Sequence, residues 1–419
     1  MLVKMPVGKG FEECEVRDEM IKAFLEPSWP SMSGCQLHHV LNALGNPIGS
    51  ESLNELAVGK KNVLVLTSDN TRPVPSQETL PAMIKAIRNG SPEASLRLLI
   101  GTGLHDWSPS RGELEGKYGS CLDQFEDVAI HRAADTGSLT LLGSLSRGNR
   151  LYVNRLITES DLVVADGYIE GHFFAGFTGG PKVVLPGISG AETIMRNHSP
   201  SNIDHQMSRC GVAEGNPIYE EMCEASRMAN LRFVVNVVLG EKKRIISAFA
   251  GDPLAAHREG RDFALRCCKV SAMPAEIVVT SNGGYPLDRN LYQLVKGISN
   301  GALTAKNGGV IVACGECTDG VGPKGFYDML ASSESPSEFL RALRAGKIWR
   351  EAQWEAQILA KTLERCKVVI VSRGVDAKTV ESMHMIHARN LTEGLEEAFN
   401  VKPEGGVTLL PDGPSVIPF

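Results

Sequence analysis

Three histidines and one lysine stand in stretches whose composition could serve chemistry. His172 and Lys182 lie in GHFFAGFTGGPKVVLPGISG, residues 171–190, while His105 ends GTGLH and His198 lies in RNHSP. An imidazole carries a proton near neutral pH or binds a borderline metal ion. A lysine ammonium is costly to remove from water without a partner. Because a single histidine is more often packed than catalytic, the placement of these four side chains relative to one another decides their role.

A polar cluster in TSDNTRPVP, residues 67–75, could hold an anion. Arg72 can grip an anion through two hydrogen bonds while Asp69 orients a neighbour, and Thr71 lies between them. The alternative is a structural Arg–Asp pair at a turn. Two prolines fix the backbone as the chain leaves this cluster.

A second polar cluster lies in PLDRNLYQLVKGIS, which we expect to be helical with Pro286 in its first turn. Spacings of three and four residues place Tyr292, Gln293 and Lys296 on one face of that helix. A phenol, an amide and an ammonium together could bind a carboxylate. The alternative is a solvated helix face, which periodicity alone favours.

Several familiar cofactor and metal motifs are missing from the chain. It has no GxGxxG fingerprint, no GxxxxGK[ST] phosphate loop, no HExxH pair and no paired CxxC motifs. These absences argue against a Rossmann dinucleotide site, a P-loop and a hydrolytic zinc site. The single CGEC, residues 314–317, fits structural or incidental thiols better than a redox pair.

Short apolar runs separated by helix-like segments predict the elements that position these clusters. Runs of Val, Ile and Leu bounded by turn residues are typical of parallel strands buried on both faces. The clusters follow such runs directly, and ligands of open α/β sheets collect at the carboxyl ends of the strands. The predicted fold is therefore α/β with mainly parallel sheets and an active site in a crevice. The expected strands are 62–66, 96–100, 161–166, 276–281, 308–314 and 367–372; the expected helices include 78–89 and 262–270.

The length of 419 residues exceeds what one core usually supports, which predicts two domains. Two apolar runs around Gly-Glu-Lys-Lys in residues 232–252 predict an antiparallel hairpin near the end of the first domain. We expect a cofactor-binding α/β domain over 1–270 and a second α/β domain over 271–399. We further expect the segment 400–419 to join the first domain.

The composition describes an ordinary globular protein without a nucleic-acid or membrane signature. Apolar residues make up 42% and charged residues 22% of the chain, and the net charge is −6. No apolar run is long enough to span a membrane, and the N-terminus has no apolar core of a secretory signal. The ten cysteines do not form a disulfide framework. We therefore expect a protein of the reducing cytoplasm that binds neither nucleic acid nor membrane.

Taken together, the clusters resemble the nickel-dependent lactate racemase family over most of the chain. The resemblance rests on six motifs in order: DNTRPVP, GTGLH, GHFFAGFTGGPKVVLPGISG, the RNH of MRNHSP, GGYPLDRNLYQLVKG and the terminal PDGP, residues 411–414. It implies a nickel-pincer nucleotide, a modified nicotinic-acid mononucleotide that grips one nickel ion through sulfur and carbon. Proteins that build this cofactor would be partners in maturation.

The resemblance also implies a role for each matching residue. Lys182 would carry the cofactor through a thioamide, His198 would bind nickel, and His105 and His172 would be paired acid–base residues. The remaining positions would line the same pocket: Arg72, Tyr292, Gln293, Lys296 and Trp354 around the substrate, and Asp69, Thr71, Gly179 and Gly180 around the cofactor, with the glycines clearing room for it.

The implied reaction is racemisation or epimerisation of a small 2-hydroxy acid at C2. Removing the α-proton as a proton would build negative charge beside a carboxylate, whereas its transfer as hydride through a 2-keto acid avoids this. Each histidine would then serve one enantiomer, with general acid–base assistance of about 10²–10⁴. Two alternatives are a nicotinamide-dependent 2-hydroxy acid dehydrogenase, weakened by the missing fingerprint, and a non-catalytic nucleotide-binding protein, which would need neither base.

The chain departs from the family pattern after His105. It carries Asp106-Trp107 where many relatives have a basic residue and a proline. An acid beside the base could change the preferred substrate or tune the pKa of His105, or it could point into solvent. Lactate itself is therefore one of several candidate substrates.

Overall fold

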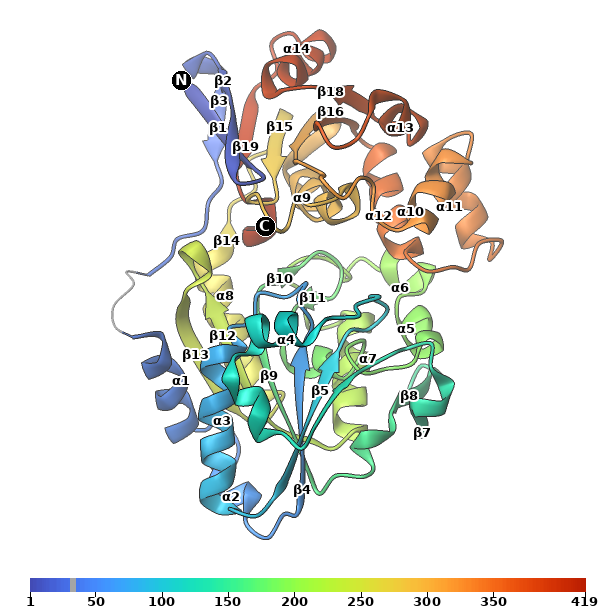
Figure 1. The fold of residues 1–419 in the computed structure, drawn as a ribbon. Helices are drawn as coiled ribbons and strands as arrows, with labels where there is room; N and C mark the ends of the chain where they lie inside the picture. Colours follow the sequence, from blue (N-terminus) through green and yellow to red (C-terminus); the bar gives the residue numbers. More distant parts are fainter. Residues whose placement is uncertain (31–34) are drawn as a thin grey trace.

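The computed structural model describes residues 1–30 and 35–419. The chain forms two α/β units, each built on a six-stranded sheet, and they lie one above the other in Figure 1. The predicted fold class, two α/β units with mainly parallel sheets, is confirmed. Within the described residues, no helix is long and apolar enough to cross a membrane.

The first sheet has the order β13-β12-β9-β4-β5-β6, and only β13 runs antiparallel to its neighbour. Its strands lack polar alternation because both faces are covered. Val63 and Val65 of β4 pack into one core while Leu64 and Leu66 pack into the other. The strands are β4 (Asn62–Ser68), β5 (Ser95–Gly101), β6 (Asp127–Ile130), β9 (Leu162–Ile169), β12 (Leu231–Leu239) and β13 (Ile245–Gly251).

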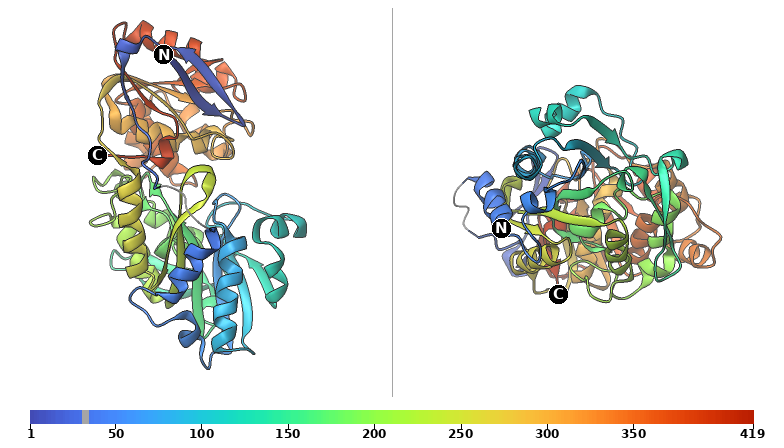
Figure 2. Two further views of the ribbon diagram at one scale, coloured as in Figure 1. Left: turned by 90° about the vertical axis from the view of Figure 1, so that its left-hand side faces the viewer. Right: turned by 90° about the horizontal axis from the view of Figure 1, so that it is seen from below.

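Helices cover both faces of this sheet. One face carries α1, α2 and α3, and the other carries α5 and α7 together with a short 3-10 turn, η5 (Gly180–Val183); Figure 2 shows these layers from the side. The helices of this unit are α1 (Gln36–Gly45), α2 (Leu53–Ala57), α3 (Ser76–Gly90), α4 (Arg111–Tyr118), α5 (Ala191–Asn197), α6 (Pro200–Asp204), α7 (Pro217–Met228) and α8 (Ala255–Cys268).

The second sheet is parallel throughout, in the order β18-β17-β16-β15-β19-β3. Helices α9 to α13 pack on one face, and α14 packs on the other beside a hairpin of β1 and β2. The elements are β1 (Leu2–Val7), β2 (Gly10–Glu15), β3 (Ile21–Phe24), β15 (Ala275–Ser281), β16 (Ala305–Cys314), β17 (Lys367–Val371), β18 (Ile386–Ala388), β19 (Val407–Leu410), α9 (Leu291–Thr304), α10 (Lys324–Ala331), α11 (Pro336–Arg344), α12 (Gln353–Leu363), α13 (Ala377–Ser382) and α14 (Leu391–Val401).

Small ribbons complete the structure. They are β7 (Leu139–Ser144) with β8 (Arg150–Asn154), β10 (Gly171–His172) with β11 (Gly176–Phe177), and β14 (Lys269–Val270) with β20 (Ile417–Pro418). The β10–β11 ribbon holds one of the predicted catalytic histidines.

The segment 400–419, which we expected to join the first unit, does so only at its end, where β20 pairs with β14 and Ile417 packs with Ile169 and Phe177. Its strand β19 pairs with β15 and β3 in the second sheet, so β3, which we expected in the first domain, also belongs to the second unit. Figure 1 shows the blue N-terminal strands beside the red C-terminal ones. All four residues of β19 (Val407–Leu410) are buried. The strand lies in the second sheet because it pairs there on both sides, with β15 and with β3.

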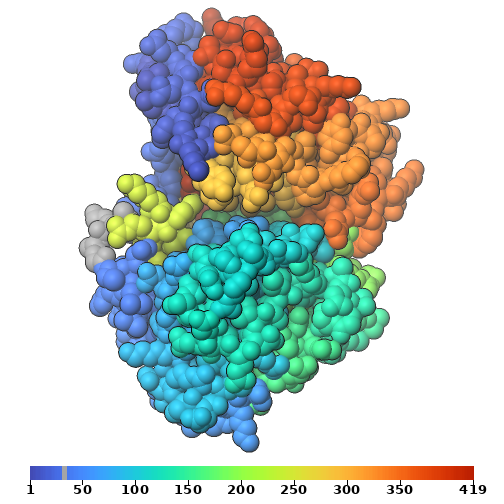
Figure 3. All heavy atoms as spheres, in the orientation of Figure 1, coloured from blue at the N-terminus to red at the C-terminus, as the bar shows by residue number. Residues whose placement is uncertain are grey.

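The two units meet at the carboxyl ends of their central strands. Figure 3 shows the teal N-terminal and orange C-terminal parts meeting across the middle of the molecule. At one end of this boundary, Asp204, the last residue of α6, binds Arg344 at 2.7 Å and Lys361 at 3.1 Å. Gln357 of α12 also donates to the carbonyl of Pro200 at 2.9 Å. These contacts tie α6 of the first unit to α11 and α12 of the second.

Candidate active site

One cavity of about 550 Å³ lies between the two units and collects all of the predicted site residues. The first unit contributes loops that follow β4, β5 and β9, as expected for an open α/β sheet. The second unit contributes the first turns of α9 and α12. The lining includes Asp69, Thr71, Arg72, His105, His172, Gly179, Gly180, Lys182, His198, Tyr292, Gln293, Lys296 and Trp354.

His105 is held by polar groups from the turn after β4. Its Nδ1 lies 2.7 Å from Asp69 Oδ2 and 3.3 Å from Thr71 Oγ1, and Asp69 also accepts from the backbone N–H of Thr71. Asp69 is 1% exposed; although burial opposes its charge, the hydrogen bond and charges of His105 and Arg72 lower its pKa. A carboxylate here makes Nδ1 the protonated nitrogen, which leaves Nε2 as a proton acceptor.

His172 has a very different setting. It lies on β10, buried against Phe173 and Phe174 with ring-centroid distances of 4.8 and 4.6 Å. The backbone N–H of Ala175 lies 3.3 Å from its Nδ1 and donates to that nitrogen when it is unprotonated. Burial, followed by the charges of Lys182 and the other cavity cations, holds the pKa of His172 well below its ordinary value.

His198 is the C-cap residue of α5. One of its ring nitrogens, Nδ1, is hydrogen-bonded, and the other, Nε2, has no hydrogen-bond partner among the described residues. Its Nδ1 lies 2.9 Å from Asn197 Oδ1, while the amide nitrogen of Asn197 donates to Glu221 at 2.8 Å. Because that second contact fixes the amide orientation, Asn197 Oδ1 is an acceptor and His198 Nδ1 carries the proton. Phe174 and Trp354 pack edge-on to the ring at 4.9 and 5.2 Å. The lone pair of Nε2 is therefore available.

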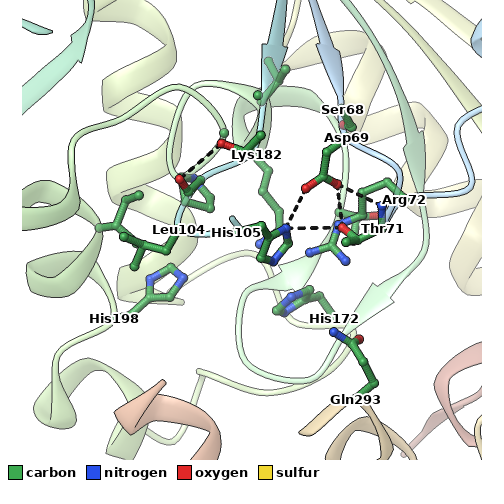
Figure 4. A pocket seen from close by; sticks show the side chains of 18 of the residues that line it. Ser68, Asp69, Thr71, Arg72, Leu104, His105, His172, Lys182, His198 and Gln293 are labelled. Atoms are coloured by element: carbon green, nitrogen blue, oxygen red, sulfur yellow. Dashed lines mark hydrogen bonds and ion pairs between the residues drawn. The ribbon is translucent and has the colours of Figure 1, made fainter. Parts of the chain in front are cut away.

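Besides Arg289, which pairs with Asp319, three cations converge on the cavity. Figure 4 shows two of them, Arg72 and Lys182, around His105 and His172. The third is Lys296 of α9. The pKa of Lys182 lies well below its ordinary value because of burial and the charges of Arg72 and Lys296. Burial and Arg72 also lower the pKa of Lys296, to about 8. Such a site favours an anionic ligand and contains an amine that can lose its proton.

The predicted residues of the second unit lie in the first turns of α9 and α12. Helix α9 begins at Leu291, later than we predicted from Pro286, because the Asn290 side chain accepts from the N–H of Gln293 at 2.9 Å and caps the helix there. Tyr292, Gln293 and Lys296 still reach the cavity from the first turns of α9. Sequence reasoning missed Glu355 beside Trp354, a buried acid in the cavity wall; its only signal was a charged residue in an otherwise apolar helix face.

Gly179 and Gly180 are required by close packing and backbone conformation, and not by the need for space in the cavity. Gly179 and Gly180 have φ of +79° and +51°, which L side chains rarely adopt. A Cβ at Gly179 would lie 2.7 Å from Tyr168 O, and one at Gly180 would lie 2.5 Å from a ring atom of His257. We expected these glycines to clear space for a ligand. Both line the cavity, but a Cβ at either position would meet protein atoms and not the space of the cavity.

Asp106 lies at the mouth of the cavity and points largely into solvent. Its side chain is 95% exposed and binds Arg132 at 2.8 Å. Trp107 packs against the core of the first unit instead of entering the cavity. The acid that departs from the family pattern therefore lies at the rim of the cavity and not against the ring of His105.

In the described part of the chain, no three or more His, Cys, Asp or Glu side chains gather as a metal-binding group. A metal ion at His198 would need further ligands from a bound molecule.

Comparison with known proteins matches both units to one family. A lactate racemase N-terminal domain model matches residues 7–211, and a lactate racemase C-terminal domain model matches residues 270–418. The lactate racemase of Thermoanaerobacterium thermosaccharolyticum is 40% identical over 99% of this chain and 98% of its own length. That of Lactiplantibacillus plantarum is 42% identical over 90% of both chains.

Solved structures agree with these matches. The lactate racemase apoprotein from T. thermosaccharolyticum superposes with a TM-score of 0.96 at 40% identity, and the match covers 100% of both chains. A Thermotoga maritima protein superposes with a TM-score of 0.69 over 92% of this chain and 97% of its own, but at 16% identity it supports the fold alone.

Proposed function

This chain belongs to the lactate racemase family and is therefore an isomerase, and we propose that it inverts C2 of lactate or a related 2-hydroxy acid. The observation that carries the proposal is one cavity in which His105 and His172 accompany three cations that can hold a carboxylate. A nucleotide-binding protein without catalysis would need neither base.

The substrate carboxylate would bind to Arg72 and Lys296, with Tyr292 and Gln293 placing its oxygens. A guanidinium can hold a carboxylate through two parallel hydrogen bonds, which fixes orientation as well as charge. The remaining wall near the rings of Phe173, Phe174 and Trp354 is apolar and suits a small alkyl group. Anchoring one end in this way presents C2 and its hydroxyl group to the histidines.

His105 would accept the hydroxyl proton of one enantiomer on Nε2. Asp69 stabilises the imidazolium that forms, since it already binds Nδ1. His172 would serve the other face of the keto acid, where the hydroxyl proton must be returned or removed. Each base keeps its proton close while the ketone turns between the two faces.

The residues present fit a nickel-pincer nucleotide. His198 is oriented by Asn197 with Nε2 free, as ligating histidines usually are by an acceptor on the other nitrogen. Lys182 presents an amine of lowered pKa, which suits amide-type attachment to an acid or thioacid. When bound there, the nucleotide would take hydride from C2 and return it. Lys182 and His198 would hold the group, and Trp354 would pack beside the nickel ligand.

The cofactor would be made by dedicated biosynthetic proteins, and we propose the cytoplasm as the compartment. All ten cysteines are free thiols, seven of them buried. A reducing compartment keeps such thiols intact and suits a thiolated nickel cofactor.

The deciding experiment produces the chain with and without the cofactor-building proteins. We expect nickel and a mass addition at Lys182 only in the first case, together with inversion of single-enantiomer lactate followed by circular dichroism. A panel of larger 2-hydroxy acids would then define the substrate. Lys182→Arg keeps the charge but cannot form the attachment, and should remove both the added mass and the inversion.

Two outcomes would contradict the proposal. Inversion by the unloaded chain would remove the need for the cofactor. Oxidation of lactate coupled to soluble NAD⁺, without inversion, would favour a dehydrogenase.

A further inference from the structure

Glu355 is a buried acid of the cavity that the proposed mechanism does not use. It lies in the first turn of α12, 2% exposed, and its Oε2 has no hydrogen-bond partner. Its neighbour Trp354 contacts His198, whereas Glu355 lines the part of the cavity reached by the cations. The free energy of a lone buried carboxylate is very high, so the charge of Glu355 must be balanced by other groups or removed by a proton.

The groups that face Glu355 come from three other elements. Of the charges that act on Glu355, that of Lys296 has the largest effect, and Tyr292 lies on the same helix, α9, as Lys296. Arg72 comes from the turn after β4, and Lys182 comes from η5. Three of these four groups are cations, and the fourth is a phenol.

The same cations are those that must receive an anionic substrate. A carboxylate at Glu355 competes with the substrate for Lys296 and repels it, since two like charges in a poorly solvated site raise each other's energy. Removing Glu355's charge when substrate enters relieves this conflict. A proton from solvent is the simplest way to do so, because it needs no movement of the helix.

We propose that Glu355 is the exchangeable counter-ion of the carboxylate site: its negative charge balances the cations that line the empty cavity, and it takes up a proton when a substrate carboxylate enters. Glu355 then acts through the charge of the cavity and not through a direct contact with Lys296. It also makes substrate binding proton-coupled. This inference rests on the proposed function only for the identity of the anion.

The electrostatics of the empty cavity agree with this exchange. Burial raises the pKa of Glu355 to about 8, and burial lowers that of Lys296 to about 8. An anion that arrives beside both groups raises both pKa values, so binding near pH 8 takes up protons. Above that pH, affinity for the carboxylate should fall by about tenfold per pH unit for each proton that must be taken up.

Calorimetry on the full-length chain tests the proposal. Racemic lactate is titrated at pH 8 in two buffers of different ionisation enthalpy, with both the unloaded chain and the loaded enzyme. A racemic ligand is already at equilibrium, so turnover produces no net heat. We expect proton uptake by the wild-type chain, and loss of most of it in Glu355→Gln, which keeps the shape but cannot ionise.

Glu351→Gln is the matched control. Glu351 reaches the same cavity from the residues before α12 but is exposed, so its charge is solvated in both states and proton uptake should remain at the wild-type level. Uptake that is equal in wild type and Glu355→Gln would overturn the proposal, as would its absence in the wild-type chain.

Infrared difference spectra of the wild-type chain provide a readout that does not depend on a variant. Lactate binding should produce a new protonated-carboxyl band, since lactate itself contributes only carboxylate bands at this pH. A spectrum without that band rejects the proposal even if Glu355→Gln fails to fold. Failure of the proposed function is distinct, because it appears as lack of inversion of single enantiomers by the loaded enzyme.

Discussion

The two histidines of the cavity occupy walls of opposite character. His105 has a carboxylate behind it and a side chain 36% exposed, whereas His172 has aromatic rings beside it and a backbone N–H behind it. The first wall sets a carboxylate oxygen 2.7 Å from Nδ1 of its ring. The second disfavours a protonated ring, since burial and the charges of Lys182, Lys296 and Arg72 depress the pKa of His172. A racemase of near-symmetric chemistry therefore starts from an asymmetric pair.

The asymmetry depends on charges that a reacting site would lose. Acylation of Lys182 would remove one cation, and a bound carboxylate would neutralise Arg72 and Lys296. Each change removes a repulsion that now opposes a proton on His172. We infer that His172 becomes a competent base only in the loaded, substrate-bound site, while His105 is prepared by the fold itself through Asp69.

Replacing either histidine should have the largest effect. Asparagine places its amide near the position of Nδ1, so His105→Asn can keep its contact with Asp69 and His172→Asn its contact with Ala175. We expect each to lower kcat/KM for inversion by about 10²–10⁴ in both directions, as loss of a general base usually does. Stopped-time circular dichroism of each lactate enantiomer measures this.

The two directions also provide an internal check. Because lactate enantiomers have equal free energy in water, kcat/KM must remain equal for both substrates, and a difference between the walls can appear only in kcat and KM taken separately. A variant that lost one histidine but kept near wild-type turnover would show that the remaining ring serves both enantiomers, and the pairing would then be wrong.

Asp69→Asn should have the next largest effect and should weaken only the His105 wall. A hydrogen bond to a charged group contributes about 1.5–3 kcal/mol, which corresponds to a loss of about 10- to 100-fold in kcat/KM. Thr71→Val is the comparison variant, because it removes the 3.3 Å contact with His105 and the hydrogen bond that Thr71 Oγ1 donates to Asp69, but leaves the carboxylate beside Nδ1. Equal losses in the two variants would show that Asp69 positions the ring without stabilising its charge.

Particular residues show what the sequence could and could not predict. The parallel strands were predictable because runs such as NVLVL carry no polar alternation, and their carboxyl ends locate His105 and Arg72 without further information. Strand β3 was not, because IKAF is short and half exposed and becomes a strand only beside β19. Nor was the cavity position of Glu355, because the cations that act on its charge come from three distant elements.

The pH dependence of stability tests whether the pKa of His172 is lowered in the folded chain. The folded chain holds His172 with a pKa well below its unfolded value of about 6.5, so only the unfolded chain binds the proton as pH falls below that value. Stability should therefore decrease on acidification, by about 1 kcal/mol for this one ring between pH 7 and pH 5.5. Urea unfolding of the unloaded chain at the two pH values measures it.

His172→Asn should lose this contribution and show a correspondingly smaller decrease. His205→Asn is the control, because His205 is exposed and water solvates its charged form. If His172→Asn lost stability on acidification as steeply as the wild type, the depressed pKa at this wall would be contradicted. Other buried histidines, such as His131 with a pKa lowered by burial to about 4, contribute a background slope common to both proteins.

Asp106→Asn should have the smallest effect, because this acid belongs to the rim and to neither wall. Its pair with Arg132 is solvent-exposed, and exposed pairs contribute little. We expect kcat/KM for lactate to change by about twofold or less, since charges that are separated by solvent are screened within about 8 Å. A 2-hydroxy acid with a second carboxylate is different, because its far end would extend toward the mouth. For such a substrate Asp106→Asn should raise kcat/KM more than for lactate, and an equal change for both would mean that the rim does not select by charge.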